Sequence, residues 1–197
     1  IGDVERGLDE ARRDALREPP TGARRWIWRA AHPRPWEDRV VVAARAHGLR
    51  PELLWAVMRQ ESGYDPDAVS YADAIGLLQL LPRIARQLGD ELGVHVRREM
   101  LFDPTWNVRL GAVHVAGAVR ALDGRVPLAL AAYNAGVHRV RRWLDERGDM
   151  PLDLFVERIP FTQTRNYVRR VTTHYARYLY LADPDAGWPL DLLEHPG

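Results

Sequence analysis

The residues with the clearest chemical potential are a few polar side chains set in apolar surroundings. Glu61 ends the run LLWAVMRQ, Gln79 stands alone in IGLLQLL, Tyr133 and Asn134 precede a glycine, and Glu157 lies in FVERIP. A carboxylic acid that acts with amide and hydroxyl groups suits the recognition and acid-catalysed cleavage of a sugar polymer. Each residue also has a structural interpretation: Gln79 could satisfy a backbone group, Tyr133 could pack, and Glu157 could pair with a nearby charge.

Glu61 occupies an unusual position for a glutamate. Its spacing places it on a helical face whose other members are hydrophobic, namely Leu53, Leu54, Val57 and Met58. If the helix ends near Gly63, both the loss of water and the negative end of the helix dipole raise the pKa of Glu61. Glu61 would then be a protonated acid that can donate a proton. The alternative is that Glu61 turns towards an arginine such as Arg59 and is only a solvated charge at a helix end.

Helical patterns and breaks at glycine and proline account for almost the whole chain. One short apolar run, residues 75–81, is too brief for its period to distinguish a strand from a buried helical turn. No segment shows sustained alternation with hairpin turns, so the sequence predicts an all-α fold. The expected helices cover residues 4–17, 24–31, 37–47, 51–62, 82–93, 103–122, 128–135, 137–145, 152–158 and 162–181.

Composition narrows the functional classes. The chain of 197 residues is 46% hydrophobic and 28% charged, which is typical of one globular domain with an appended segment. A net charge of +1 gives no sign of nucleic-acid binding, and the basic residues, all arginine, fit solvated helix faces. No apolar run approaches transmembrane length.

The sequence offers no support for a metal or a cofactor. The absence of cysteine excludes disulfides and thiolate metal sites, and the seven histidines never occur at ligand spacing with each other. There is no glycine-rich phosphate loop and no GxSxG elbow. We therefore expect neither a metal nor a cofactor.

Four blocks of sequence, in order, resemble the soluble lytic transglycosylases and their goose-type-lysozyme-like catalytic domain. They are QESGY at residues 60–64, GLLQ at residues 76–79, AYNAG at residues 132–136, and FVERIPFTQTRNYV at residues 155–168. The last block is similar to that of the large soluble subgroup. The resemblance covers residues 32 to 181 and implies an all-α, lysozyme-like fold with an N-terminal helical extension.

The resemblance also implies a division of the chain and a compartment. We expect an N-terminal extension or linker over residues 1–31, the catalytic domain over residues 32–182, and a C-terminal tail over residues 183–197. Because the chain begins with Ile1, we expect a processed or truncated product whose export signal lies upstream. The expected location is the periplasm or cell envelope.

The mechanism implied by the resemblance has Glu61 as the one catalytic carboxylate. Glu61 would protonate the oxygen between N-acetylmuramic acid and N-acetylglucosamine and then accept the proton of the muramyl C6 hydroxyl, which closes a 1,6-anhydro ring. The substrate's own N-acetyl group would support the charge on the sugar. The resemblance gives substrate-binding roles to Ser70, Gln79, Leu81, Tyr133, Asn134, Glu157 and Tyr167.

Two departures from the family pattern concern the loop after Glu61. Leu78 and Leu81 stand where methionine is common, a change that conserves volume but alters the surface offered to the saccharide. Asp73 stands where glycine is usual. If that position needs a positive φ, aspartate is among the few tolerated residues, and the placement of Ser70 depends on it.

Alternatives remain at this point. A muramidase of the same fold would cleave the same bond with water, and an inactive peptidoglycan-binding module would only recognise the glycan. The expected partner is the peptidoglycan strand, with cell-envelope proteins as further partners, and we expect a monomer.

Overall fold

The computed structural model describes residues 25–186, and in this part of the chain the architecture is α-helical. Most helix ends lie within about two residues of the sequence predictions. The elements in order are α2 (Arg25–Ala31), α3 (Glu37–Ala46), α4 (Pro51–Ser62), α5 (Pro82–Glu91), the 3₁₀ turn η2 (Arg98–Phe102), α6 (Pro104–Ala121), α7 (Val126–Ala135), α8 (Val137–Arg147), α9 (Leu152–Glu157), α10 (Thr162–Ala182) and the 3₁₀ turn η3 (Pro184–Ala186).

Local sequence explains where these helices begin and end. Pro51, Pro82 and Pro104 each occupy the first turn of a helix, where a missing N–H costs no hydrogen bond. Asp103 caps α6 because its carboxylate accepts hydrogen bonds from the N–H groups of Thr105 (2.7 Å) and Trp106 (3.3 Å). These signals fix the starts of α4, α5 and α6.

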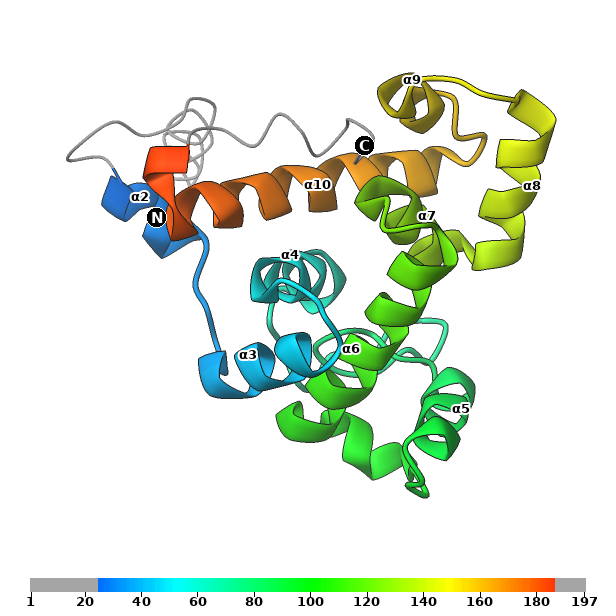
Figure 1. Cartoon of the computed structure of the whole chain (residues 1–197). Coiled ribbons are helices and arrows are strands. Elements are labelled where there is room, and N and C mark those ends of the chain that lie inside the picture. Colours follow the sequence, from blue (N-terminus) through cyan, green and yellow to red (C-terminus); the bar gives the residue numbers. More distant parts are fainter. Residues whose placement is uncertain (1–24, 187–197) are drawn as a thin grey trace, which may run out of the picture.

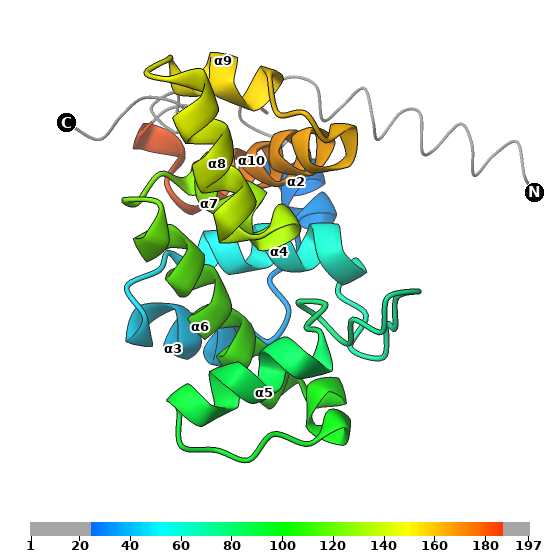
Figure 2. The same ribbon diagram turned by 90° about the vertical axis from the view of Figure 1, so that its right-hand side faces the viewer.

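The long helix α10 crosses the molecule and packs against α2, α4, α7 and α9 (Figure 1). Below it, α6 packs against α3, α5 and α7, and Figure 2 shows the segment between α4 and α5 on one side of this lower group. The ring of Trp55 on α4 stacks on that of Tyr178 on α10, with centroids 5.9 Å apart. Both rings are almost fully buried, and burying each stabilises the fold by roughly 2 kcal/mol or more.

Residues 75–81 form neither a strand nor a helical turn. Ile75 makes isolated β-bridges to Val69 and Leu80, and the polypeptide then enters α5. The buried side chain of Asn107 on α6 holds this segment in place. Its amide nitrogen donates to the carbonyls of Ile75 (2.9 Å) and Leu101 (2.7 Å), and its amide oxygen accepts from the N–H of Leu78 (2.9 Å). Asn107 therefore supplies the partners that a regular ladder would otherwise provide.

The predicted helix over residues 4–17 lies outside the described residues, as does the tail beyond residue 186. Trp28 of α2 is 1% exposed and packs edge-on against Tyr180 of α10. The division into extension, domain and tail stays a prediction. Within residues 25–186, every helix is too short or too polar to cross a membrane.

Candidate active site

The end of α4 carries Glu61 in partly buried surroundings. Burial raises the pKa of Glu61 to about 7, because removing water from a carboxylate disfavours its charged form. Gly63 then ends the helix in a left-handed conformation, with φ +60°, so the chain turns away directly after the acid. The raised pKa agrees with the interpretation of Glu61 as a proton donor.

Tyr167 on α10 holds the carboxyl group of Glu61. Its hydroxyl donates a hydrogen bond to Glu61 Oε1 at 2.6 Å, and this bond lowers the pKa of Glu61 against the larger effect of burial. The Tyr167 side chain is only 6% exposed. Burial and the nearby carboxylate raise the pKa of Tyr167 well above its usual value, so the hydroxyl stays a donor.

The pairing of Glu61 with Arg59, which the sequence left open, does not form. Arg59 points elsewhere: its guanidinium donates to the carbonyl of Ala31 and, at 3.4 Å, to the hydroxyl of Tyr64. Instead of meeting a cation, the end of α4 is tied to the following loop through Ser62. The Ser62 hydroxyl donates to the carbonyl of Leu77 (2.9 Å) and accepts from the N–H of Tyr64 (3.1 Å).

Ser70 and Asp73 shape the loop that follows, which we call the 63–81 loop. Ser70 Oγ accepts a hydrogen bond from the N–H of Ala74 (3.0 Å), and the N–H of Asp73 donates to the Ser70 carbonyl (3.0 Å). Asp73 has φ +62°, so this position does need the left-handed conformation that the sequence suggested. Ser70 is thus placed by a closed turn.

Gln79, Leu78 and Leu81 have different environments within the same loop. The Gln79 amide nitrogen donates to the carbonyls of Ala68 (3.1 Å) and Gly76 (3.0 Å), which is the structural role that the sequence left open. Leu78 is fully buried and forms no part of a saccharide-facing surface, contrary to the expectation drawn from its position, because it packs against Gly111 on α6. Leu81 is 37% exposed and remains available for contact.

Tyr133 and Asn134, at the end of α7, are anchored by partners that sequence inspection did not identify. The Tyr133 hydroxyl donates to the carbonyl of Leu78 at 2.5 Å, and burial, with a smaller effect of Glu61, raises its pKa well above the usual value. The exposed Asn134 accepts a hydrogen bond from the buried hydroxyl of Thr164 at 2.8 Å. Thr164 lies in the FVERIPFTQTRNYV block, and the family resemblance of that block is the signal in the sequence that could have identified Thr164.

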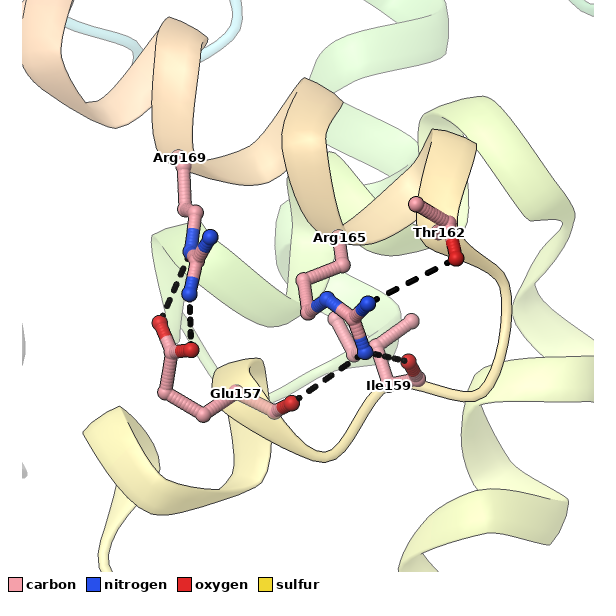
Figure 3. A network of polar contacts seen from close by, with 5 residues as sticks. All are labelled: Glu157, Ile159, Thr162, Arg165 and Arg169. Atoms are coloured by element: carbon pink, nitrogen blue, oxygen red, sulfur yellow. Dashed lines mark hydrogen bonds and ion pairs between the residues drawn. The ribbon is translucent and has the colours of Figure 1, made fainter.

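Glu157, at the end of α9, is exposed and forms an ion pair with Arg169 of α10 (Figure 3). Arg169 Nε donates to Glu157 Oε1 at 2.8 Å and its Nη2 donates to the other oxygen, and this pairing lowers the pKa of Glu157. Beside it, Arg165 donates to the carbonyls of Glu157 (3.4 Å) and Ile159 (3.2 Å) and so holds the turn between the two helices. Arg165 and Arg169 were not singled out from the sequence.

Of the expected site residues, the structure joins Glu61 directly to Tyr167, and it brings Tyr133 close enough for the charge on Glu61 to act on its pKa. No described hydrogen bond connects Glu61 to the remaining ones, which are Ser70, Gln79, Leu81, Asn134 and Glu157. Within residues 25–186 there is no group of three or more histidine or acidic side chains placed to hold a metal.

The described residues form an all-α fold with a partly buried carboxylic acid at a helix end, an arrangement that suits acid catalysis. Residues 39–155 match the model of the family described as the transglycosylase SLT domain, and the chain belongs to this family. The soluble lytic murein transglycosylase of Salmonella typhimurium is 32% identical over 149 residues, which are 74% of this chain and 23% of that protein. The membrane-bound lytic murein transglycosylase C of Actinobacillus pleuropneumoniae is 30% identical over 161 residues, covering 70% of this chain and 44% of the relative.

Solved structures support the same fold. An inactive mutant of lytic transglycosylase Slt from Pseudomonas aeruginosa superposes with a TM-score of 0.73 and 34% identity, covering 76% of this chain and 25% of that one. The 70-kDa soluble lytic transglycosylase of Escherichia coli gives a TM-score of 0.76 with 29% identity, covering 80% and 26%. This chain therefore spans about a quarter of these larger proteins.

Proposed function

We propose that this domain cleaves the β-1,4 bond between N-acetylmuramic acid and N-acetylglucosamine in peptidoglycan by lytic transglycosylation, without water. The observation that carries the proposal is Glu61, a carboxylic acid with a pKa raised to about 7 and held by the hydroxyl of Tyr167. Such a group is protonated in part of the population near neutral pH and can act first as acid and then as base. The names of the relatives support the same activity.

The reaction requires one proton to leave Glu61 and one to return. Glu61 protonates the glycosidic oxygen as the C1–O bond breaks, and the substrate's N-acetyl carbonyl supports the positive charge that develops on the muramyl ring. The carboxylate of Glu61 then takes the proton of the C6 hydroxyl while O6 forms a bond to C1. The products are a 1,6-anhydromuramyl end and a free N-acetylglucosamine end, and Glu61 regains its starting protonation state.

The other site residues have binding or positioning roles in this proposal. Tyr167 is a positioning residue, because its hydroxyl donates to Glu61 and its side chain is buried. Asn134 and Leu81 are exposed enough to contact sugar, and Ser70 and Gln79 lie on the loop beside the acid. Glu157 meets the N-acetyl or peptide side of the muramyl unit and brings Arg169 with it.

Location and partners follow from the substrate. Peptidoglycan lies in the cell envelope, so we place the domain in the periplasm or envelope, acting on glycan strands with no cofactor. Relatives include proteins named as soluble and as membrane-bound. The monomeric state and any envelope protein partners stay predictions.

The test of the catalytic assignment is Glu61→Gln, which keeps the size of the side chain and removes its transferable proton. We expect release of soluble fragments from purified peptidoglycan to fall by roughly a thousandfold or more. The matched control is Glu91→Gln, since Glu91 also ends a helix but is exposed. Peptidoglycan release by Glu61→Gln at the rate of the control would refute the assignment.

A further inference from the structure

The tip of the 63–81 loop, residues 70–74, is a small closed turn that contains Ser70. The N–H of Ser70 donates to the carbonyl of Ala74 at 2.9 Å, and the N–H of Ala74 donates to the Ser70 hydroxyl at 3.0 Å. The N–H of Asp73 donates to the Ser70 carbonyl at 3.0 Å. The position of the Ser70 hydroxyl therefore depends on the conformation of this turn.

Burial does little to hold the turn in place. Tyr71, Ala72 and Asp73 are exposed, and Figure 2 shows the segment between α4 and α5 projecting from the helices. Among the described residues, the ion pair between Asp73 and Arg98 is the only hydrogen-bonded or charged contact between residues 70–74 and the rest of the domain. The placement of the turn therefore depends on this ion pair.

Arg98 provides a fixed anchor for the ion pair. It lies on η2, where the side chain of Leu101 is fully buried and the Leu101 carbonyl accepts a hydrogen bond from the Asn107 amide at 2.7 Å. The Arg98 guanidinium lies 5.7 Å from the ring centroid of Phe102, and its Nη2 donates to Asp73 Oδ1 at 2.5 Å. The ion pair thus connects an exposed turn to a segment that the hydrophobic core fixes.

Asp73 suits both the backbone and the ion pair. Its φ of +62° is a conformation that aspartate tolerates better than most residues with a side chain. Glycine, which is usual at this position in the family, fits the same backbone but has no side chain to bind Arg98. Aspartate therefore adds a contact between residues 25 positions apart that glycine could not make.

We propose that Asp73 and Arg98 are positioning residues for the reaction, because their ion pair holds the turn that presents Ser70 to the glycan before the substrate binds. The proposal rests on the proposed function, which takes Ser70 as a contact of the glycan. A turn that is already closed needs no ordering on binding, so loss of the ion pair should raise KM and leave kcat unchanged. The pair is exposed, so its effect should be moderate and should weaken as salt is added.

The first experiment measures kcat and KM of Asp73→Asn on soluble, uncrosslinked peptidoglycan strands. Asparagine also tolerates a positive φ and keeps the size of the side chain, but it has no charge for Arg98. We expect KM to rise by about threefold at low salt with kcat unchanged, and the ratio of the two KM values to approach one as salt is added. Asp73→Gly should raise KM at least as much. An unchanged KM, or a fall in kcat alone, would overturn the proposal.

The matched control is Asp123→Asn. Asp123 is also an exposed aspartate with a positive φ, +56°, and it also pairs with an arginine, Arg125, at 3.3 Å. It lies in the turn between α6 and α7, outside the 63–81 loop. The KM of this variant should match that of the wild type. A rise in KM equal to that of Asp73→Asn would show a general effect of lost charge and contradict the role given to Asp73.

The second experiment observes the turn without any substrate, through hydrogen exchange of the backbone amides of residues 73 and 74. These amides donate to the carbonyl and the hydroxyl of Ser70, so their exchange reports opening of the turn. In Asp73→Asn and in Arg98→Ala we expect both amides to exchange about threefold faster. Amides inside α4 and α10 should exchange as in the wild type, which separates local opening from a loss of overall stability.

The double variant Asp73→Asn with Arg98→Ala completes the test. Its amides should exchange no faster than those of either single variant, because both changes remove the same contact. Additive effects, or exchange that neither single variant alters, would overturn the proposal. If the wild type releases no product from peptidoglycan, the proposed function fails, while the exchange rates still decide whether the ion pair holds the turn.

Discussion

The hydroxyl of Tyr167 on α10 donates to the carboxyl group of Glu61 on α4 at 2.6 Å, and the two residues are 106 positions apart in the chain. Two opposing effects set the pKa of Glu61. Burial raises the pKa of Glu61, and the hydrogen bond, which favours the ionised form, lowers it by a smaller amount. The result is a pKa of about 7, where a carboxyl group can both give and accept a proton near neutral pH.

Tyr167→Phe should raise the pKa of Glu61 further, because it removes the donor that stabilises the carboxylate. In the wild type, kcat/KM should fall as pH rises through about 7, when Glu61 loses the proton it must donate. In the variant we expect this fall to move upward by about half to one pH unit. The pH dependence of peptidoglycan solubilisation measures it.

The control for that variant is Tyr64→Phe, which removes a hydroxyl that contacts Tyr178 rather than Glu61. Its pH profile should match the wild type. A Tyr167→Phe profile that stays in place or moves to lower pH would contradict the role given to this hydrogen bond.

Glu61 should also reduce the stability of the protein at neutral pH. Its pKa rises from 4.5 to about 7 on folding, so the folded state holds a proton that the unfolded state has lost. Stability therefore falls as pH increases between these two values and stays lower above them, by at most about 3 kcal/mol. Glu61→Gln should be more stable than the wild type at pH 8 and similar to it at pH 4 when unfolded with urea. Equal stability of Glu61→Gln and the wild type at pH 8 would show that burial does not raise the pKa of Glu61.

The sequence predicted the helices and the acid because both depend on local patterns. Glu61 shares a face with hydrophobic residues, and Pro51 and Gly63 mark the ends of its helix. The partners of the acid depend on tertiary packing: no spacing indicates that Tyr167 meets Glu61, or that Arg169 meets Glu157. The interpretation of Leu78 failed for the same reason, since its burial follows from the close approach of Gly111 on α6.

Asn107 is a second residue that only the structure identifies, and its loss should be severe. Asn107→Ala would leave the N–H of Leu78 and the carbonyl of Leu101 without their partner, and the carbonyl of Ile75 would keep only the N–H of Leu80. Each unsatisfied group costs about 1–3 kcal/mol, so we expect a loss of roughly 3 kcal/mol or more in the free energy of unfolding. Denaturant unfolding checks this. A loss below about 1 kcal/mol would mean that water replaces the amide.

His32 and His174 should make the contact between α2 and α10 sensitive to acid. Their rings lie 5.7 Å apart, and burial, with a smaller effect of Arg59, lowers the pKa of each to about 3. The unfolded chain binds protons near pH 6.5, so stability is full above that pH and declines as pH falls towards 3.

His174→Phe removes one of these groups without removing a described hydrogen bond, since His174 Nδ1 is buried without a partner. We expect the variant to lose about 3 kcal/mol less stability than the wild type between pH 7 and pH 4. Urea unfolding at the two pH values provides the measurement. Identical losses in both proteins would show that His174 is not held neutral by the fold.

The most direct test of the central claim is the mass of the products that the wild-type protein releases from purified peptidoglycan. Transglycosylation through Glu61 predicts muropeptides that end in 1,6-anhydromuramic acid and are lighter by one water than hydrolysis products. These products should appear with the wild type and with Glu91→Gln, and be absent with Glu61→Gln. Muropeptides with reducing muramic acid ends from the wild-type protein would show hydrolysis instead and contradict the account.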